Sequence, residues 1–121
     1  MIINEVINQD DYISLIQTIN LAIKETGVVV DKNKIAGVLS SLDYYNSKEE
    51  KIACLVRSLI KNHGFTNGNK RTAGAFYLAM CKHMNYNPPF NNREFADLFI
   101  TISNNNYSVE TITSLLFPNR N

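Results

Sequence analysis

The chain has 121 residues, of which 45% are hydrophobic, and a formal net charge of +1. This length suits one core, so we expect a single domain over residues 1–121. A pI of about 7.8 with scattered lysines excludes the basic stripe of a dedicated nucleic-acid binder. Since no apolar run has the length of a membrane span or a signal-peptide core, we expect a cytoplasmic protein with no membrane partner.

The two cysteines, Cys54 and Cys81, lack the paired spacing of a zinc site, and each lies within an apolar helical pattern. This arrangement favours buried thiols in a reducing compartment over a structural disulfide.

Apolar residues recur mostly at intervals of three and four, which predicts an all-α fold, a compact bundle of helices. The first helix should begin at Asp10 or Asp11 and end at Gly27, because glycine tolerates the left-handed conformation of helix ends. Its apolar face would carry Ile13, Ile16, Ile19, Leu21 and Ile23. Clustered β-branched residues before a polar turn predict a short extended flap over residues 27–33.

A second helix over residues 34–42 should be broken by residues 43–46. Ser47 followed by Glu50 is a capping box that opens a third helix. The apolar face of that helix would hold Ile52, Leu55, Val56, Leu59 and Ile60.

A fourth, strongly apolar helix should run from Asn69 through Met84, and Pro88 and Pro89 end that region. The fifth helix would start at Asn91 or Asn92 and stop at residues 104–106. A last helix, capped by Ser108, would end near Phe117 and Pro118. Three aromatic residues form a stripe that we interpret as core: Phe95, Phe99 and Tyr107.

One histidine and two tyrosines lie outside these patterns, and we interpret them from their neighbours in the sequence. His83 has no partner motif and should be a partly exposed helix residue. Tyr44 and Tyr45 belong either to the rim of the core or to a surface for a partner.

Residues 63–71 join two apolar helices with a composition unusual for a connector. They contain one imidazole, two cations, two glycines, two carboxamides and one phenylalanine. A helix begins where the loop ends, so unpaired backbone N–H groups and the positive end of the helix dipole face outward there. Gly68 lets the backbone approach a ligand, and Lys70 and Arg71 add positive charge. The pattern predicts a phosphate-binding turn.

The other two notable residues of this loop are His63 and Phe65. His63 lies at the end of the preceding helix, where it could take a proton from an incoming hydroxyl. Phe65 would turn inward and anchor the loop to the core. Taken singly, the histidine would be a solvated cap, the two cations charged surface, and the Asn-Gly pair a turn. Their combination within one short loop favours a site.

Residues 63–73, His-Gly-Phe-Thr-Asn-Gly-Asn-Lys-Arg-Thr-Ala, resemble the signature loop of the Fic/Doc superfamily, H-x-F-x-[DE]-[GA]-N-[GK]-R. Lys70 followed by Arg71 resembles the Doc (death-on-curing) branch more than the Fic branch. Fic proteins typically have glycine at the position of Lys70. They also have a second arginine at the position where this chain has Gly74. The flap, the flanking helices and the length also resemble a compact Doc-like protein, which implies the Fic/Doc helical fold.

The resemblance implies an enzyme that uses ATP as co-substrate. Fic proteins transfer AMP to a protein hydroxyl, whereas Doc-type toxins phosphorylate elongation factor Tu and arrest translation. His63 would be the general base, with Lys70 and Arg71 as the other catalytic residues. Gly68, Asn69 and Lys70 would form the anion-binding turn, and Arg71 would clamp phosphate oxygens bidentately. In the family, lysine at position 70 accompanies a nucleotide placement that presents the γ-phosphate to the target hydroxyl. The flap could hold the target segment by strand addition.

Asn67 stands where the family has Asp or Glu, the carboxylate that holds Mg²⁺. An amide oxygen is a weaker ligand for this ion, so Mg²⁺ should be weakly held and the nucleotide phosphates should supply most of the charge. Three interpretations stay open: an enzyme with a loosely held metal, a binding protein without catalysis, or an engineered residue.

Some family members silence themselves with an internal helix reading [ST]-x-x-x-E-[GN], and no Ser or Thr here lies four residues before a Glu. We therefore expect a separate antitoxin protein as partner. The leading hypothesis is a Doc-like kinase toxin of a toxin–antitoxin pair. A protein AMP transferase, a non-catalytic nucleotide or protein binder and a plain helical interaction module are the alternatives.

Overall fold

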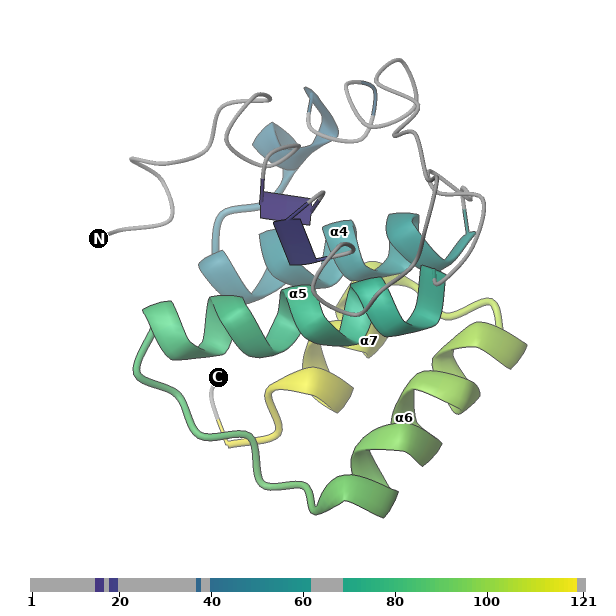
Figure 1. The fold of residues 1–121 in the computed structure, drawn as a ribbon. Helices are drawn as coiled ribbons and strands as arrows, with labels where there is room; N and C mark the ends of the chain where they lie inside the picture. The colour runs from purple at the N-terminus through teal and green to yellow at the C-terminus, as the bar shows by residue number, and fades with distance from the viewer. Residues whose placement is uncertain (1–14, 17, 20–36, 38–39, 62–68, 120–121) are drawn as a thin grey trace.

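The computed structural model describes residues 15–16, 18–19, 37, 40–61 and 69–119 (Figure 1). Every regular element of this part of the chain is a helix, which confirms the all-α prediction. The elements are η1 (Ser41–Tyr44), α4 (Lys48–Lys61), α5 (Asn69–His83), α6 (Asn92–Asn104) and α7 (Val109–Leu116). No described helix is long and apolar enough to cross a bilayer. The flap predicted for residues 27–33 lies outside the described residues.

Only short pieces of the first two predicted helices are described. Leu15, Ile16, Thr18 and Ile19 are helical, and Ile16 is fully buried, in agreement with an apolar face on this segment. The predicted ends of the first helix lie outside the described residues. Farther along, Ser40 is still helical.

The second helix ends later than its sequence predicts. A break was expected from Asp43, but the 3₁₀ helix η1 continues to Tyr44, and Tyr45 is the first extended residue. The N–H of Tyr45 donates to the carbonyl of Leu42 over 3.0 Å, which tightens the last turn around a buried leucine. The two tyrosines therefore separate. Tyr44 is 85% exposed, whereas Tyr45 packs against the core.

Helix α4 begins at the predicted cap. The N–H of Glu50 donates to Ser47 Oγ over 3.0 Å, and Ser47 Oγ donates in turn to the Glu50 carboxylate. All five apolar residues predicted for this helix are buried, together with Ala53 and Cys54. In agreement with the prediction, both Cys54 and Cys81 are buried thiols.

Helix α5 ends within one residue of the predicted Met84. A left-handed residue stops it before the prolines are reached. Asn85 has a φ of 56°. The N–H of Tyr86 donates to the carbonyl of Cys81 over 2.9 Å, and that of Asn85 to Lys82 over 3.2 Å. This is the Schellman arrangement, in which asparagine can replace the usual glycine. His83, the last residue of α5, is exposed as expected.

The caps of the last two helices confirm their predicted starts. Asn91 caps α6 in a complete capping box, because its side chain accepts from the Glu94 N–H and Glu94 accepts from the Asn91 N–H. Ser108 Oγ accepts from the Thr111 N–H at the start of α7. Helix α7 ends at Leu116, before Phe117 and Pro118.

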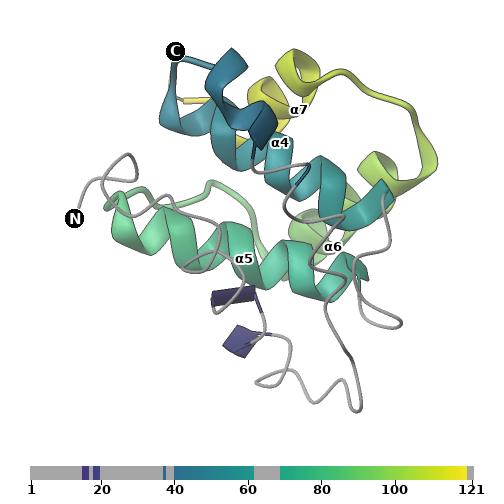
Figure 2. The same cartoon turned by 90° about the horizontal axis from the view of Figure 1, so that it is seen from above.

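The core lies where α4 packs against α5 on one side and α7 on the other (Figure 2). Tyr77 of α5 is fully buried, and its hydroxyl donates to the carbonyl of Leu116. Its ring meets Phe117 edge-on at 5.4 Å and lies 6.0 Å from both Phe95 and Phe99 of α6. Phe99 is buried, and Phe95 and Tyr107 are partly buried against the core, as the predicted stripe requires.

Candidate functional site

The predicted site divides between described and undescribed residues. His63, Phe65, Asn67 and Gly68 lie in residues 62–68, outside the described residues, so their placement stays a prediction. Asn69 is the first residue of α5, and Lys70 and Arg71 follow it in the first turn. The structure therefore describes the helical end of the predicted phosphate-binding turn.

The first turn of α5 has a charged face and a buried face. Lys70 and Arg71 are exposed, whereas Thr72 and Ala73 are buried. No acidic residue lies in this turn itself. The first four N–H groups of a helix have no carbonyl partner within the helix, and they carry the positive end of its dipole. Two cations and this helix end together favour a bound anion.

The end of α4, which leads into residues 62–68, is held by two cations that the sequence did not identify. Lys61 Nζ donates to the carbonyl of Ser103 over 3.0 Å, close to the end of α6. Arg57 Nε donates to the carbonyl of Tyr107 over 2.9 Å, and its Nη2 to Asn106 Oδ1 over 3.3 Å. Carbonyls in the last turn of a helix lack intrahelical donors, so the Lys61 contact also caps α6. These bonds join the second half of α4 to the end of α6 and to the residues that follow it.

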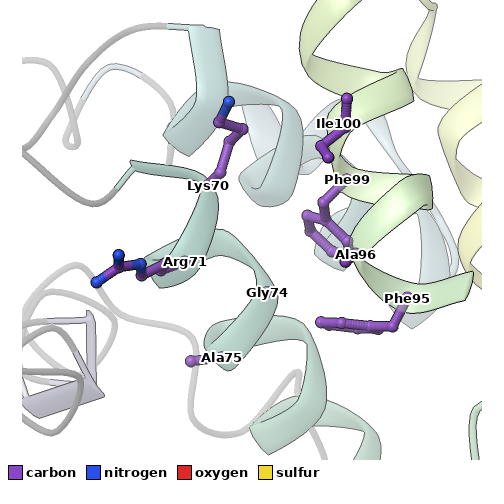
Figure 3. A pocket seen from close by; sticks show the side chains of 8 residues that line it. All are labelled: Lys70, Arg71, Gly74, Ala75, Phe95, Ala96, Phe99 and Ile100. Carbon is purple, nitrogen blue, oxygen red and sulfur yellow. The ribbon is translucent and has the colours of Figure 1, made fainter. Parts of the chain in front are cut away.

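A pocket of about 470 Å³ lies between the start of α5 and the middle of α6 (Figure 3). Its walls are mostly apolar, and the only charges among its described lining residues are the two cations of α5. The lining residues are Lys70, Arg71, Gly74, Ala75, Phe95, Ala96, Phe99 and Ile100. In Figure 3 the rings of Phe95 and Phe99 point from α6 toward α5, and Arg71 points away from α6. The sequence placed Phe95 and Phe99 in the core and did not predict that they also line a pocket.

Gly74 lets the two helices approach at this pocket. A Cβ atom at position 74 would lie 3.2 Å from both Cε2 and Cζ of Phe95, closer than most such contacts. Gly74 is also the position at which Fic proteins typically carry their second arginine. Here the ring of Phe95 occupies the adjoining space, so an arginine would require that ring to move. An isolated glycine inside a helical pattern can have a packing reason, but the sequence does not show which residue packs there.

The described residues differ in how well they suit an anion and a metal ion. It holds no group of three His, Cys, Asp or Glu side chains that could bind a metal ion. An exposed pair of cations fits phosphate oxygens, not Mg²⁺.

Comparison with known proteins identifies a protein family that the chain matches. The model of the Fic/DOC family matches residues 13–81, more than half of the chain and the whole of the predicted loop. Enzymes of this family generally transfer nucleotide-derived groups to proteins. The match ends within α5, so the α6 side of the pocket lies beyond it. No curated protein and no solved structure is detectably similar to the chain. The chain belongs to the Fic/Doc family.

Proposed function

We propose that the chain is a Doc-like protein kinase that transfers the γ-phosphate of ATP to a hydroxyl group of another protein. The observation that supports this most is the pocket beside Lys70 and Arg71. A nucleotide joins a flat, largely apolar base to a chain of anionic phosphates. Apolar walls next to two cations at a helix N-terminus are complementary to both parts. The volume of about 470 Å³ also falls within the roughly 300–1,000 Å³ of small-molecule sites.

The residues of the loop have distinct roles in this proposal. Arg71 clamps two phosphate oxygens, and Lys70 neutralises charge that develops on the transferred group. His63 accepts the proton of the target hydroxyl. The hydroxyl oxygen then bonds to the γ-phosphorus, the bond from that phosphorus to the β–γ bridging oxygen breaks, and ADP leaves with the electron pair. Mg²⁺, when bound, supplies further positive charge at the phosphates, and Asn67 is the loop residue that would hold it.

Two residues favour phosphate transfer over AMP transfer. Lys70 replaces the glycine and Gly74 replaces the second arginine of Fic enzymes. An enzyme that transfers AMP must present the α-phosphate to the target, whereas a kinase must present the γ-phosphate. Resemblance to the Doc branch at both positions favours the kinase.

The same resemblance supports the partners of the proposed enzyme. Its substrate would be a translation factor, elongation factor Tu, and its activity would arrest protein synthesis in the cytoplasm. Control would come from a separate antitoxin protein, because the chain lacks the internal inhibitory sequence of some relatives. Co-expression with the small protein encoded beside it should restore growth, and harmless expression of the active enzyme alone would contradict the toxin role.

The test is transfer of label from γ-labelled and from α-labelled ATP, with Mg²⁺, onto a bacterial lysate that contains translation factors. We expect a protein band labelled only from the γ-position and absent with His63→Ala. Label from the α-position would instead identify an AMP transferase. Lys82→Ala is the matched control, because Lys82 is an exposed cation at the opposite end of α5.

A non-catalytic nucleotide binder is the second candidate, and Asn67 is the residue that favours it. Neither label would then be transferred, although ATP would still bind. Asn67→Asp separates a weak enzyme from a binder. Restored labelling of the Asn67→Asp protein at low Mg²⁺ would mean that the loop is complete apart from its metal ligand. No labelling by either the natural or the Asn67→Asp protein would mean that the chain only binds the nucleotide.

A further inference from the structure

The pocket has two chemically different ends. Lys70 and Phe95 lie at opposite ends of the group of lining side chains, with Gly74 one helical turn beyond Lys70 (Figure 3). Four residues of α-helix span about 6 Å, so the cationic end and the aromatic wall are separated along the axis of α5. If phosphates bind at the cationic end, as in the proposed function on which this inference rests, the base lies toward Phe95.

The ring of Phe95 is held in place on several sides. It stacks on Tyr77 with ring centroids 6.0 Å apart and an angle of 22° between the planes. The Phe99 ring lies 4.9 Å away at 39°. On the α5 side the ring reaches Gly74, where even a methyl group would be crowded at 3.2 Å. Tyr77 behind it is fully buried and bonded to the Leu116 carbonyl, so the ring cannot retreat into the core.

From this arrangement we propose that Phe95, in the position that Gly74 permits, is the specificity-determining residue of the pocket and limits the size of the base that it accepts. Adenine can stack against the aromatic wall, whereas a base with a bulky substituent meets a ring that Tyr77, Phe99 and Gly74 confine on three sides. The family match does not include this wall, because it ends before α6. The limit on base size therefore rests on the packing of α5 against α6 and not on the family match.

The inference predicts how the pocket changes when the wall is removed. Phe95→Ala would open the pocket toward the face of Tyr77, and a benzyl group attached to the base could stack there. Gly74→Ala would press on the ring and narrow the pocket. Since one extra group in a tight apolar pocket commonly changes affinity by about tenfold or more, the effect should be measurable in a direct binding assay.

The test compares the affinities of the full chain for ATP and for N6-benzyl-ATP by calorimetry, with Mg²⁺ held constant. We expect the natural protein to prefer ATP by about tenfold, Phe95→Ala to remove or invert that preference, and Gly74→Ala to weaken both ligands. Leu98→Ala is the control, because Leu98 packs against the core from the same helix but does not line the pocket. Its preference should match that of the natural protein.

The possible failures are distinguishable. If the natural protein binds ATP and Phe95→Ala leaves the preference unchanged, the size limit is wrong and the proposed function stands. If the natural protein binds neither nucleotide, the proposed function is wrong and the size limit falls with it. Should Phe95→Ala lose its helical circular dichroism, Phe95→Leu replaces it. Leucine retains apolar contact but not the ring, so it should shift the preference in the same direction by a smaller factor.

Discussion

The first turn of α5 and the middle of the same helix differ in what their side chains do. Lys70 and Arg71 are exposed and carry charge beside an open pocket, whereas Phe76 and Tyr77, less than two turns later, are fully buried. The buried part stabilises the fold, and it holds the exposed part in a fixed position relative to α6. A change in the middle of α5 should therefore affect stability, and a change in its first turn should affect binding.

The largest effect on stability should come from Tyr77→Ala. This change removes a fully buried ring that contacts Phe95, Phe99 and Phe117 and also removes the hydrogen bond to Leu116. We expect the free energy of unfolding in urea to fall by about 3–5 kcal/mol. A fall below about 1 kcal/mol would mean that this cluster is not the centre of the core.

Arg71→Ala should reduce transfer and leave stability nearly unchanged, the reverse of what we expect for a buried residue. Transfer of label from ATP should fall about 100-fold, as expected when a charged group that stabilises the transition state is lost. The free energy of unfolding should change by no more than about 0.5 kcal/mol, because the side chain is exposed. Lys82→Ala should change neither quantity. Equal losses of transfer in the two variants would contradict a site at the first turn.

Lys61→Met tests whether the end of α4 contributes to both stability and transfer. The variant keeps the apolar stem but loses the donor to the Ser103 carbonyl, so stability should fall by about 1–2 kcal/mol. Transfer should fall as well, because Lys61 is the last residue of α4 before the loop that contains His63. Lys51→Met, on the same helix, serves as the comparison. Identical stability and transfer in both variants would show that the Ser103 contact has no such role.

The smallest effect concerns the pH dependence of stability. Burial raises the pKa of the Tyr77 phenol well above its ordinary value of 10.0. Because the folded pKa exceeds the unfolded one, the contribution of Tyr77 is complete below about pH 10 and is lost as the pH rises further, by at most about 1.4 kcal/mol per pH unit. The stability advantage of the natural protein over Tyr77→Phe should therefore shrink by about 1 kcal/mol between about pH 9 and pH 11. A constant difference would mean that Tyr77 ionises normally.

The regular helices could be predicted from the sequence because their signals are local. Ser47 and Ser108 accept backbone hydrogen bonds at the helix starts where their spacing predicted caps, and the buried residues of α4 follow the expected three- and four-residue intervals. The conformation that ends a helix was harder to predict than the residue that starts one. Asn85 stops α5 through a left-handed conformation, but an asparagine in sequence does not reveal which conformation it adopts.

The pocket could not be predicted, because it depends on residues that are distant in sequence. Gly74 and Phe95 belong to different helices, and their contact exists only after α5 and α6 have packed. The contacts of Arg57 and Lys61 similarly join residues at least 42 positions apart, and their acceptors include backbone carbonyls that any residue could provide. The loop could be recognised from the sequence because its unusual residues lie next to one another.

The most direct test of a nucleotide site at the start of α5 is titration of the ¹⁵N-labelled protein with ATP and Mg²⁺, followed by amide chemical shifts. We predict the largest shifts at Lys70, Arg71 and Gly74 and on the facing turn of α6 at Phe99 and Ile100, with little change at Lys82 and His83. Large shifts at the Lys82 end of α5, or shifts that spare both sides of the pocket, would contradict the account.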